Sequence, residues 1–150
     1  MGTSFRPYEP DKFLLFSPEI LDGLPQDHMV HKVGLIVDWL DLSAFYLPYE
    51  GGGRRNTPYH PAMMVKVLIY GYATGVCSSR KLARGLKEDL AFRVLAADNT
   101  PAHRTICGFR QRHLEDLKRV FAETVHLANE LGLEGFDGLT IDSTKVPPEA

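Results

Sequence analysis

The sequence predicts an all-α fold: a multi-helix domain with a helix-turn-helix-like unit and one long final helix, ending in the start of a short β-strand. Apolar residues recur at helical spacing along most of the 150 residues. Pro and Gly stand where such helices would begin and end, and strand-like alternation is confined to residues 139–142. At this length the chain has room for one domain with an adequate core.

Two helices and one further helical turn are expected before residue 50. A serine followed by a proline at residues 17–18 predicts the start of a short helix, which Gly23 would end. Residues 26–40 carry an apolar stripe at helical spacing and predict a longer helix. Residues 42–46 predict one more turn, and the run GGGRRNTP at residues 51–58 is a loop by composition.

The next helix is expected at the centre of the core. His60 and Pro61 predict its start, Thr74 its last residue and Gly75 its C-terminal cap. Its sequence, AMMVKVLIYGYA, is apolar on almost every side, which is typical of a helix buried all round.

Three helices are expected in the remainder of the chain. Two serines at residues 78–79 cap a basic helix, and a short helix follows at residues 90–96. Thr100, as the N-cap before a proline, predicts the start of a long helix that runs to Leu131, where Gly132 ends it.

The long helix has two different faces when its residues are placed at 100° intervals. The stripe predicted to face the core is Ile106, Phe109, His113, Leu117 and Val120. The opposite side gathers Arg104, Thr105, Gly108, Gln111 and Arg112. Arg, Gln and Thr are side chains that contact phosphates and base edges. Gly108 costs about 1 kcal/mol relative to Ala inside a helix, so its place on this face suggests the close approach of another backbone.

Positive charge is concentrated in the middle of the chain. Residues 54–112 hold eleven Lys and Arg against three acids, a net +8, whereas the remaining residues have a net charge of −10. This asymmetry favours a polyanion-binding surface, and the alternative is a chance cluster on a solvated face. With the helix pattern it predicts DNA contact, ending near Glu115 where the long helix turns acidic. The predicted DNA-binding residues are Arg80, Lys81, Arg84, Lys87, Arg104, Thr105, Gln111 and Arg112.

The composition excludes several classes of protein. Hydrophobic residues make up 44% and charged residues 24% of the chain, as in ordinary globular proteins. The longest mostly apolar run, residues 62–73, is too short to span a bilayer, so no membrane partner is expected. The N-terminus carries no secretory signal, and the two cysteines lack the spacing of a zinc site. We therefore expect a cytoplasmic protein.

Asp142 stands at the end of the strand-like run. A carboxylate at a strand end is a reasonable Mg²⁺ ligand, but two-metal phosphoryl transfer needs several carboxylates. Taken alone, Asp142 is more typical of a turn.

Three stretches together resemble the N-terminal part of insertion-sequence DDE transposases with an InsH-like N-terminal domain. They are HPAMMVKVLIYGYATGVCSSRKLARGLKEDLAFRVLA, HRTICGFRQRH and GLTIDSTK, and the resemblance covers roughly residues 15–146. It implies that residues 1–136 are a helical domain that binds the terminal inverted repeats in double-stranded DNA. It also implies that residues 137–150 are the first strand fragment of a ribonuclease-H-like catalytic domain.

The resemblance gives Asp142 a role. It matches the first of three catalytic carboxylates, which hold Mg²⁺ in the complete enzyme, and Lys145 matches the lysine of the same motif. Position 143 is Ser where the family usually has Gly, and the chain departs from the family after Val146. We therefore expect a truncated transposase that is catalytically incomplete and takes no cofactor of its own, with Asp142 a metal ligand only if the catalytic domain is completed.

Two other interpretations of the chain stay open. It could be a regulatory module that pairs with itself or with full-length transposase. It could also be an active nuclease or strand transferase, if another chain supplied the missing carboxylates. The resemblance implies a bacterial, nucleoid-associated protein in each case.

Overall fold

The chain folds as helices around one central helix, in a computed structural model that describes residues 5–8, 24–25, 27–49 and 58–141. Every regular element in these ranges is helical, so the all-α prediction is confirmed. In chain order the elements are α2 (Met29–Asp38), α3 (Ser43–Tyr46), the 3-10 turn η2 (Leu47–Tyr49), α4 (Pro61–Ala73), α5 (Ser79–Glu88), α6 (Leu90–Leu95), α7 (His103–Arg112) and α8 (Leu114–Leu131). The helix expected at residues 17–23 lies outside the described residues.

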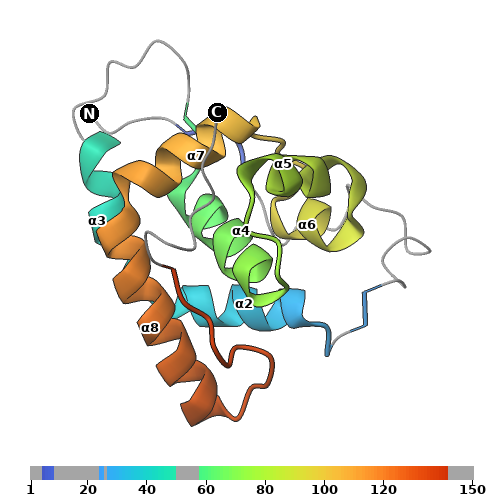
Figure 1. Cartoon of the computed structure of the whole chain (residues 1–150), viewed down its shortest axis with the longest axis vertical. Coiled ribbons are helices and arrows are strands. Elements are labelled where there is room, and N and C mark those ends of the chain that lie inside the picture. Colours follow the sequence, from blue (N-terminus) through green and yellow to red (C-terminus); the bar gives the residue numbers. More distant parts are fainter. Residues whose placement is uncertain (1–4, 9–23, 26, 50–57, 142–150) are drawn as a thin grey trace.

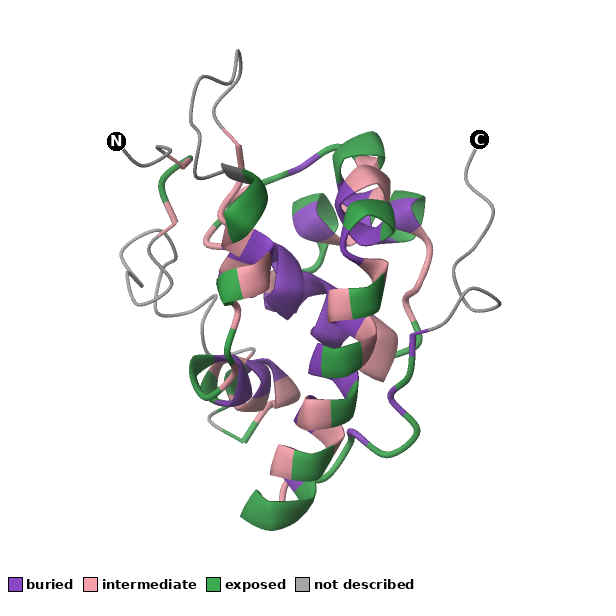
Figure 2. Cartoon of the chain, turned by 90° about the vertical axis from the view of Figure 1, so that its left-hand side faces the viewer, coloured by how far each residue is buried: buried purple, intermediate pink, exposed green. Residues whose placement is uncertain are grey.

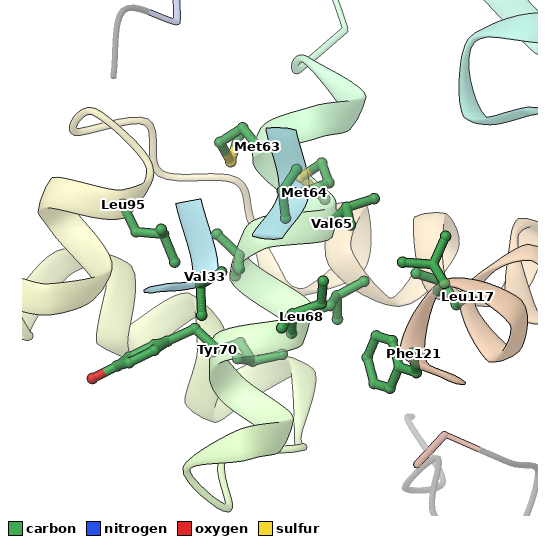
Figure 3. Packing of buried hydrophobic residues seen from close by; sticks show 14 of the residues in the cluster. Val33, Met63, Met64, Val65, Leu68, Tyr70, Leu95, Leu117 and Phe121 are labelled. Atoms are coloured by element: carbon green, nitrogen blue, oxygen red, sulfur yellow. The ribbon is translucent and has the colours of Figure 1, made fainter. Parts of the chain in front are cut away.

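The central helix is α4, as its sequence predicts. Pro61 occupies its first turn, and Gly75, with φ of 84°, follows its C-terminal cap. Every residue from Met63 to Gly71 is buried (Figure 2). Figure 3 shows side chains of three other helices around α4: Val33 of α2, Leu95 of α6, and Leu117 and Phe121 of α8.

The other helices surround α4 in two groups (Figure 1). At one end α2 crosses α4 and contacts α8, which runs along the side of the molecule. At the other end α5, α6 and α7 lie together, with α5 in contact with both α6 and α7. The helices α5 and α7, which carry the predicted DNA-binding residues, are therefore neighbours in space although α6 stands between them in the sequence.

The prediction of one long helix from Thr100 to Leu131 is wrong, because the structure has two helices in this range. The backbone leaves helical geometry at His113, where φ is −113° and ψ is 22°. The first of the two helices also begins later than predicted, with Ala102 rather than Thr100 as its N-cap. The break lets α7 pack against α5 while α8 packs against α2. It also lets Phe121 of α8 pack against Tyr72 of α4.

The segment after α8 returns over the core without forming a strand in its described residues. Gly132, with φ of 70°, ends the helix as predicted. Leu139 and Ile141 are buried and Thr140 is exposed, so the alternation that suggested a strand is present as alternating burial. A strand needs a neighbouring strand to pair with, and the described part of the chain contains no strand. Among all the described residues, no helix is both long enough and apolar enough to cross a membrane.

Candidate nucleic-acid interface

The helix α5 separates an apolar face from a cationic one. Ser78 is its N-cap and accepts a hydrogen bond from the Lys81 amide at 3.5 Å. Leu82 and Leu86 are fully buried against the core. The exposed side chains on its solvent side are Glu88 and the four cations expected to bind DNA: Arg80, Lys81, Arg84 and Lys87.

The helix α7 is divided in the same way. Ile106 and Phe109 are buried, and Phe109 stacks on Phe45 of α3 with ring centroids 5.9 Å apart. The predicted polar face is exposed at four positions: Arg104, Thr105, Gln111 and Arg112. Gly108 lies half-buried among them. The structure thus agrees with the predicted orientation of α7, whereas contact of these residues with DNA stays a prediction.

The cations of α5 and α7 are not neutralised by neighbouring acids in the described chain. Six exposed Lys and Arg side chains on these two helices form no ion pair with any described residue. Elsewhere the pattern is different, since Lys118 pairs with Glu115 at 3.2 Å and Arg119 with Glu123 at 3.2 Å on α8. The end of the molecule formed by α5 and α7 therefore carries six exposed cations that have no ion-pair partner among the described residues, and we call this the cationic surface. Its residues are Arg80, Lys81, Arg84, Lys87, Arg104 and Arg112.

Arg110 was not predicted as a special residue, yet its side chain is fully buried. Its Nη1 donates to the Cys77 carbonyl at 2.6 Å and to the Tyr72 hydroxyl at 3.3 Å, and its Nη2 donates to the Ser79 hydroxyl at 2.7 Å. The sequence held one signal for this, because position 110 lies only about 40° from Ile106 on a helix of 100° per residue. An arginine at the edge of an apolar stripe can be buried if the core offers it acceptors.

A comparison with known protein families matches the part of the chain that contains helices α2 to α7. The profile of the family described as "Transposase domain (DUF772)" matches residues 18–112, more than half of the chain. The chain belongs to this transposase-domain family. No curated protein and no solved structure matches it significantly. The matched range ends at Arg112, the last residue of α7, so the family domain contains the whole cationic surface and stops where the helix breaks.

The break after the transposase domain is occupied by His113, which is buried as predicted. Its ring lies 4.6 Å from that of Phe109 and 5.1 Å from that of Phe45, centroid to centroid. Burial lowers the pKa of His113 below its usual 6.5, and the charge of Arg112 lowers it further, while Asp116 acts in the opposite direction. The imidazole is therefore neutral at pH 7 and adds no charge to the cationic surface.

The transposase domain offers no metal centre in its described residues. No three His, Cys, Asp or Glu side chains lie together there in a way that could hold a metal ion. Cys77 and Cys107 are both free thiols. Asp142, the residue expected to be the first catalytic carboxylate, lies outside the described residues.

Proposed function

We propose that the transposase domain binds double-stranded DNA through the cationic surface and recognises terminal inverted repeats during DNA transposition. The observation that carries this proposal is the set of six exposed cations, none of them in an ion pair with a described residue, on two helices in contact within a domain of a transposase family. Phosphates supply most of the affinity of such a surface, because neutralising them releases counterions. The exposure of these cations leaves them available for this contact.

The two helices have different parts in the proposed complex. The helix α7 enters the major groove, where Gln111 reaches base edges and Arg104, Thr105 and Arg112 reach the backbone. The helix α5 lies across the phosphates and contributes charge alone. The break at His113 turns α8 away from the duplex, which suits its acids at positions 115 and 116 because they would repel phosphates.

A duplex-binding titration at several salt concentrations tests this proposal. The probe is a duplex with the terminal inverted repeat of the encoding element, and a shuffled duplex is the comparison. We expect tighter binding to the repeat, and a log–log salt slope that is smaller by about 2 when Arg104→Ala and Arg112→Ala are combined. Arg119→Ala on α8 is the matched control, because this arginine is already paired with acids. Equal binding of both duplexes, unchanged in the double variant, would rule the proposal out.

Gly108 provides a second test, because stability and binding should change in opposite directions. A Cβ at this position would meet only Arg112 Nη1, at an ordinary 3.6 Å. Gly108→Ala should therefore raise the free energy of unfolding by about 0.5–1 kcal/mol. If the DNA backbone approaches α7 at Gly108, the added methyl group should weaken duplex binding. Gly34→Ala on α2, which has open space around it, should stabilise without changing affinity. Wild-type affinity in Gly108→Ala would show that nothing packs closely there.

A second candidate function is pairing with another copy of a transposase. It is favoured by two large, exposed apolar side chains at the C-terminal end of α2. In Figure 1, α2 lies at the end of the molecule away from α5 and α7. Leu35 in α2 is 48% exposed, and Trp39, the C-cap residue four positions later, is 69% exposed. Sedimentation of the chain with and without full-length transposase, compared with Trp39→Ser, tests this role. A strict monomer in both mixtures would exclude it.

A further inference from the structure

Arg110 connects the two helices of the cationic surface from the inside. Its carbonyl and hydroxyl acceptors belong to Cys77, in the connection between α4 and α5, and to Ser79, the first residue of α5. Arg110 itself stands in the last turn of α7. The C-terminal half of α7 is thus fastened to the start of α5, directly beside Arg80 and Lys81 on the outside.

These hydrogen bonds fix the orientation of α7 relative to α5 as well as the distance between the two helices. Two different nitrogens of one planar guanidinium donate to two different residues, at 2.6 Å and 2.7 Å. A single hydrogen bond would let α7 pivot on α5, whereas a planar group held at two points also fixes the rotation of α7. A lysine could keep the charge, but its single ammonium nitrogen cannot reproduce the fork.

Stability alone is a weak reason for an arginine at this place. Desolvating a cation costs several kcal/mol, and apolar residues of similar volume often replace buried ionic groups with no loss of stability. Helix α7 already has Ile106 and Phe109 to hold it in the core. What an apolar residue cannot provide is a directional attachment to the start of α5.

We propose that Arg110 is a positioning residue of the DNA-binding surface, setting α7 against α5 so that cations from both helices meet one duplex. This inference rests on the proposed function. Arg104 and Arg112 are eight positions apart, about 12 Å along a helix, and phosphates on a duplex have a fixed spacing. If α7 rotates relative to α5, the cations of one helix lose their phosphates while those of the other keep them.

A cycle of variants separates positioning from a structural role. Arg110→Lys keeps the charge, and Ser79→Ala removes only one hydrogen bond of the fork. Ser79→Ala is the milder change and is included because it should fold even if Arg110→Lys does not. In each background the effect of Arg104→Ala on duplex affinity is measured. We expect both variants to lower the log–log salt slope by about 2, the contribution of Arg104 and Arg112, and to reduce the Arg104→Ala effect toward none. Val120→Ala, a buried change on α8, is the control and should leave that effect intact.

The outcomes distinguish this inference from the function on which it rests. If the wild-type chain shows no salt-dependent duplex binding, the proposed function fails and Arg110 has no surface to position. If the wild type binds, and Arg110→Lys and Ser79→Ala keep the full salt slope and the full Arg104→Ala effect, only the positioning role is overturned. An equal reduction in Val120→Ala would also overturn it, because general loosening would then explain the result.

Discussion

Gly71→Ala is expected to lower the free energy of unfolding by about 1–3 kcal/mol, the usual cost of overpacking a core. A Cβ on Gly71 would lie 2.5 Å from Leu82 Cδ2 and 2.7 Å from the Val76 carbonyl oxygen. The side chain of Leu82 could rotate, but the Val76 backbone cannot withdraw easily, because its amide donates to the Gly71 carbonyl at 2.7 Å. The clash therefore outweighs the gain of about 1 kcal/mol that alanine normally brings to a helix.

Urea unfolding of Gly71→Ala and Gly34→Ala measures this effect against a matched control. Both glycines are inside helices, but Gly34 has no atom within 4 Å of an added Cβ. We expect the midpoint to fall for Gly71→Ala and to rise for Gly34→Ala, with the urea dependence unchanged in both. A rise in both midpoints would mean that α5 can move away from α4. In that case the position of the cationic surface would not be set by the α4–α5 contact.

The bounds of α4 and α5 could be predicted because the signals that set the ends of these helices depend only on nearby residues. Pro61, Gly75 and Ser78 define helix ends through backbone conformation and capping, which need no distant partner. The burial of Leu82 and the exposure of Arg84 follow from helical periodicity on an amphipathic helix. The exposed positions of the candidate site could therefore be predicted, although their contact with DNA is a separate question.

The break at His113 and the burial of Arg110 could not be predicted in the same way. The apolar stripe continues through position 113 at spacings that suit one unbroken helix, and neither Pro nor Gly marks a break. The break comes from tertiary structure, since α7 follows α5 while α8 follows α2 and α4. Likewise the acceptors of Arg110 lie more than thirty positions earlier in the chain. Only the fold brings these acceptors to Arg110.

Phe109→Ala is expected to cause the larger loss of stability, about 3–5 kcal/mol for a fully buried phenylalanine. Phe109 is 2% exposed and stacks on Phe45, which is itself fully buried. Its ring also packs on His113 at the break between α7 and α8. Removing the ring therefore opens a cavity where α3, α7 and α8 meet. Since domains of this size have a total stability of about 5–15 kcal/mol, the variant should lose a large part of it.

Thermal and urea unfolding of three variants of α7 test this expectation. Phe109→Leu should cost less than Phe109→Ala, because it leaves a smaller cavity. Arg112→Ala, a neighbouring exposed position, should change stability by no more than about 0.5 kcal/mol. If Phe109→Ala were as mild as Arg112→Ala, α7 would not depend on its aromatic contact with α3. The bonds of Arg110 would then be the main attachment of α7 to the rest of the transposase domain.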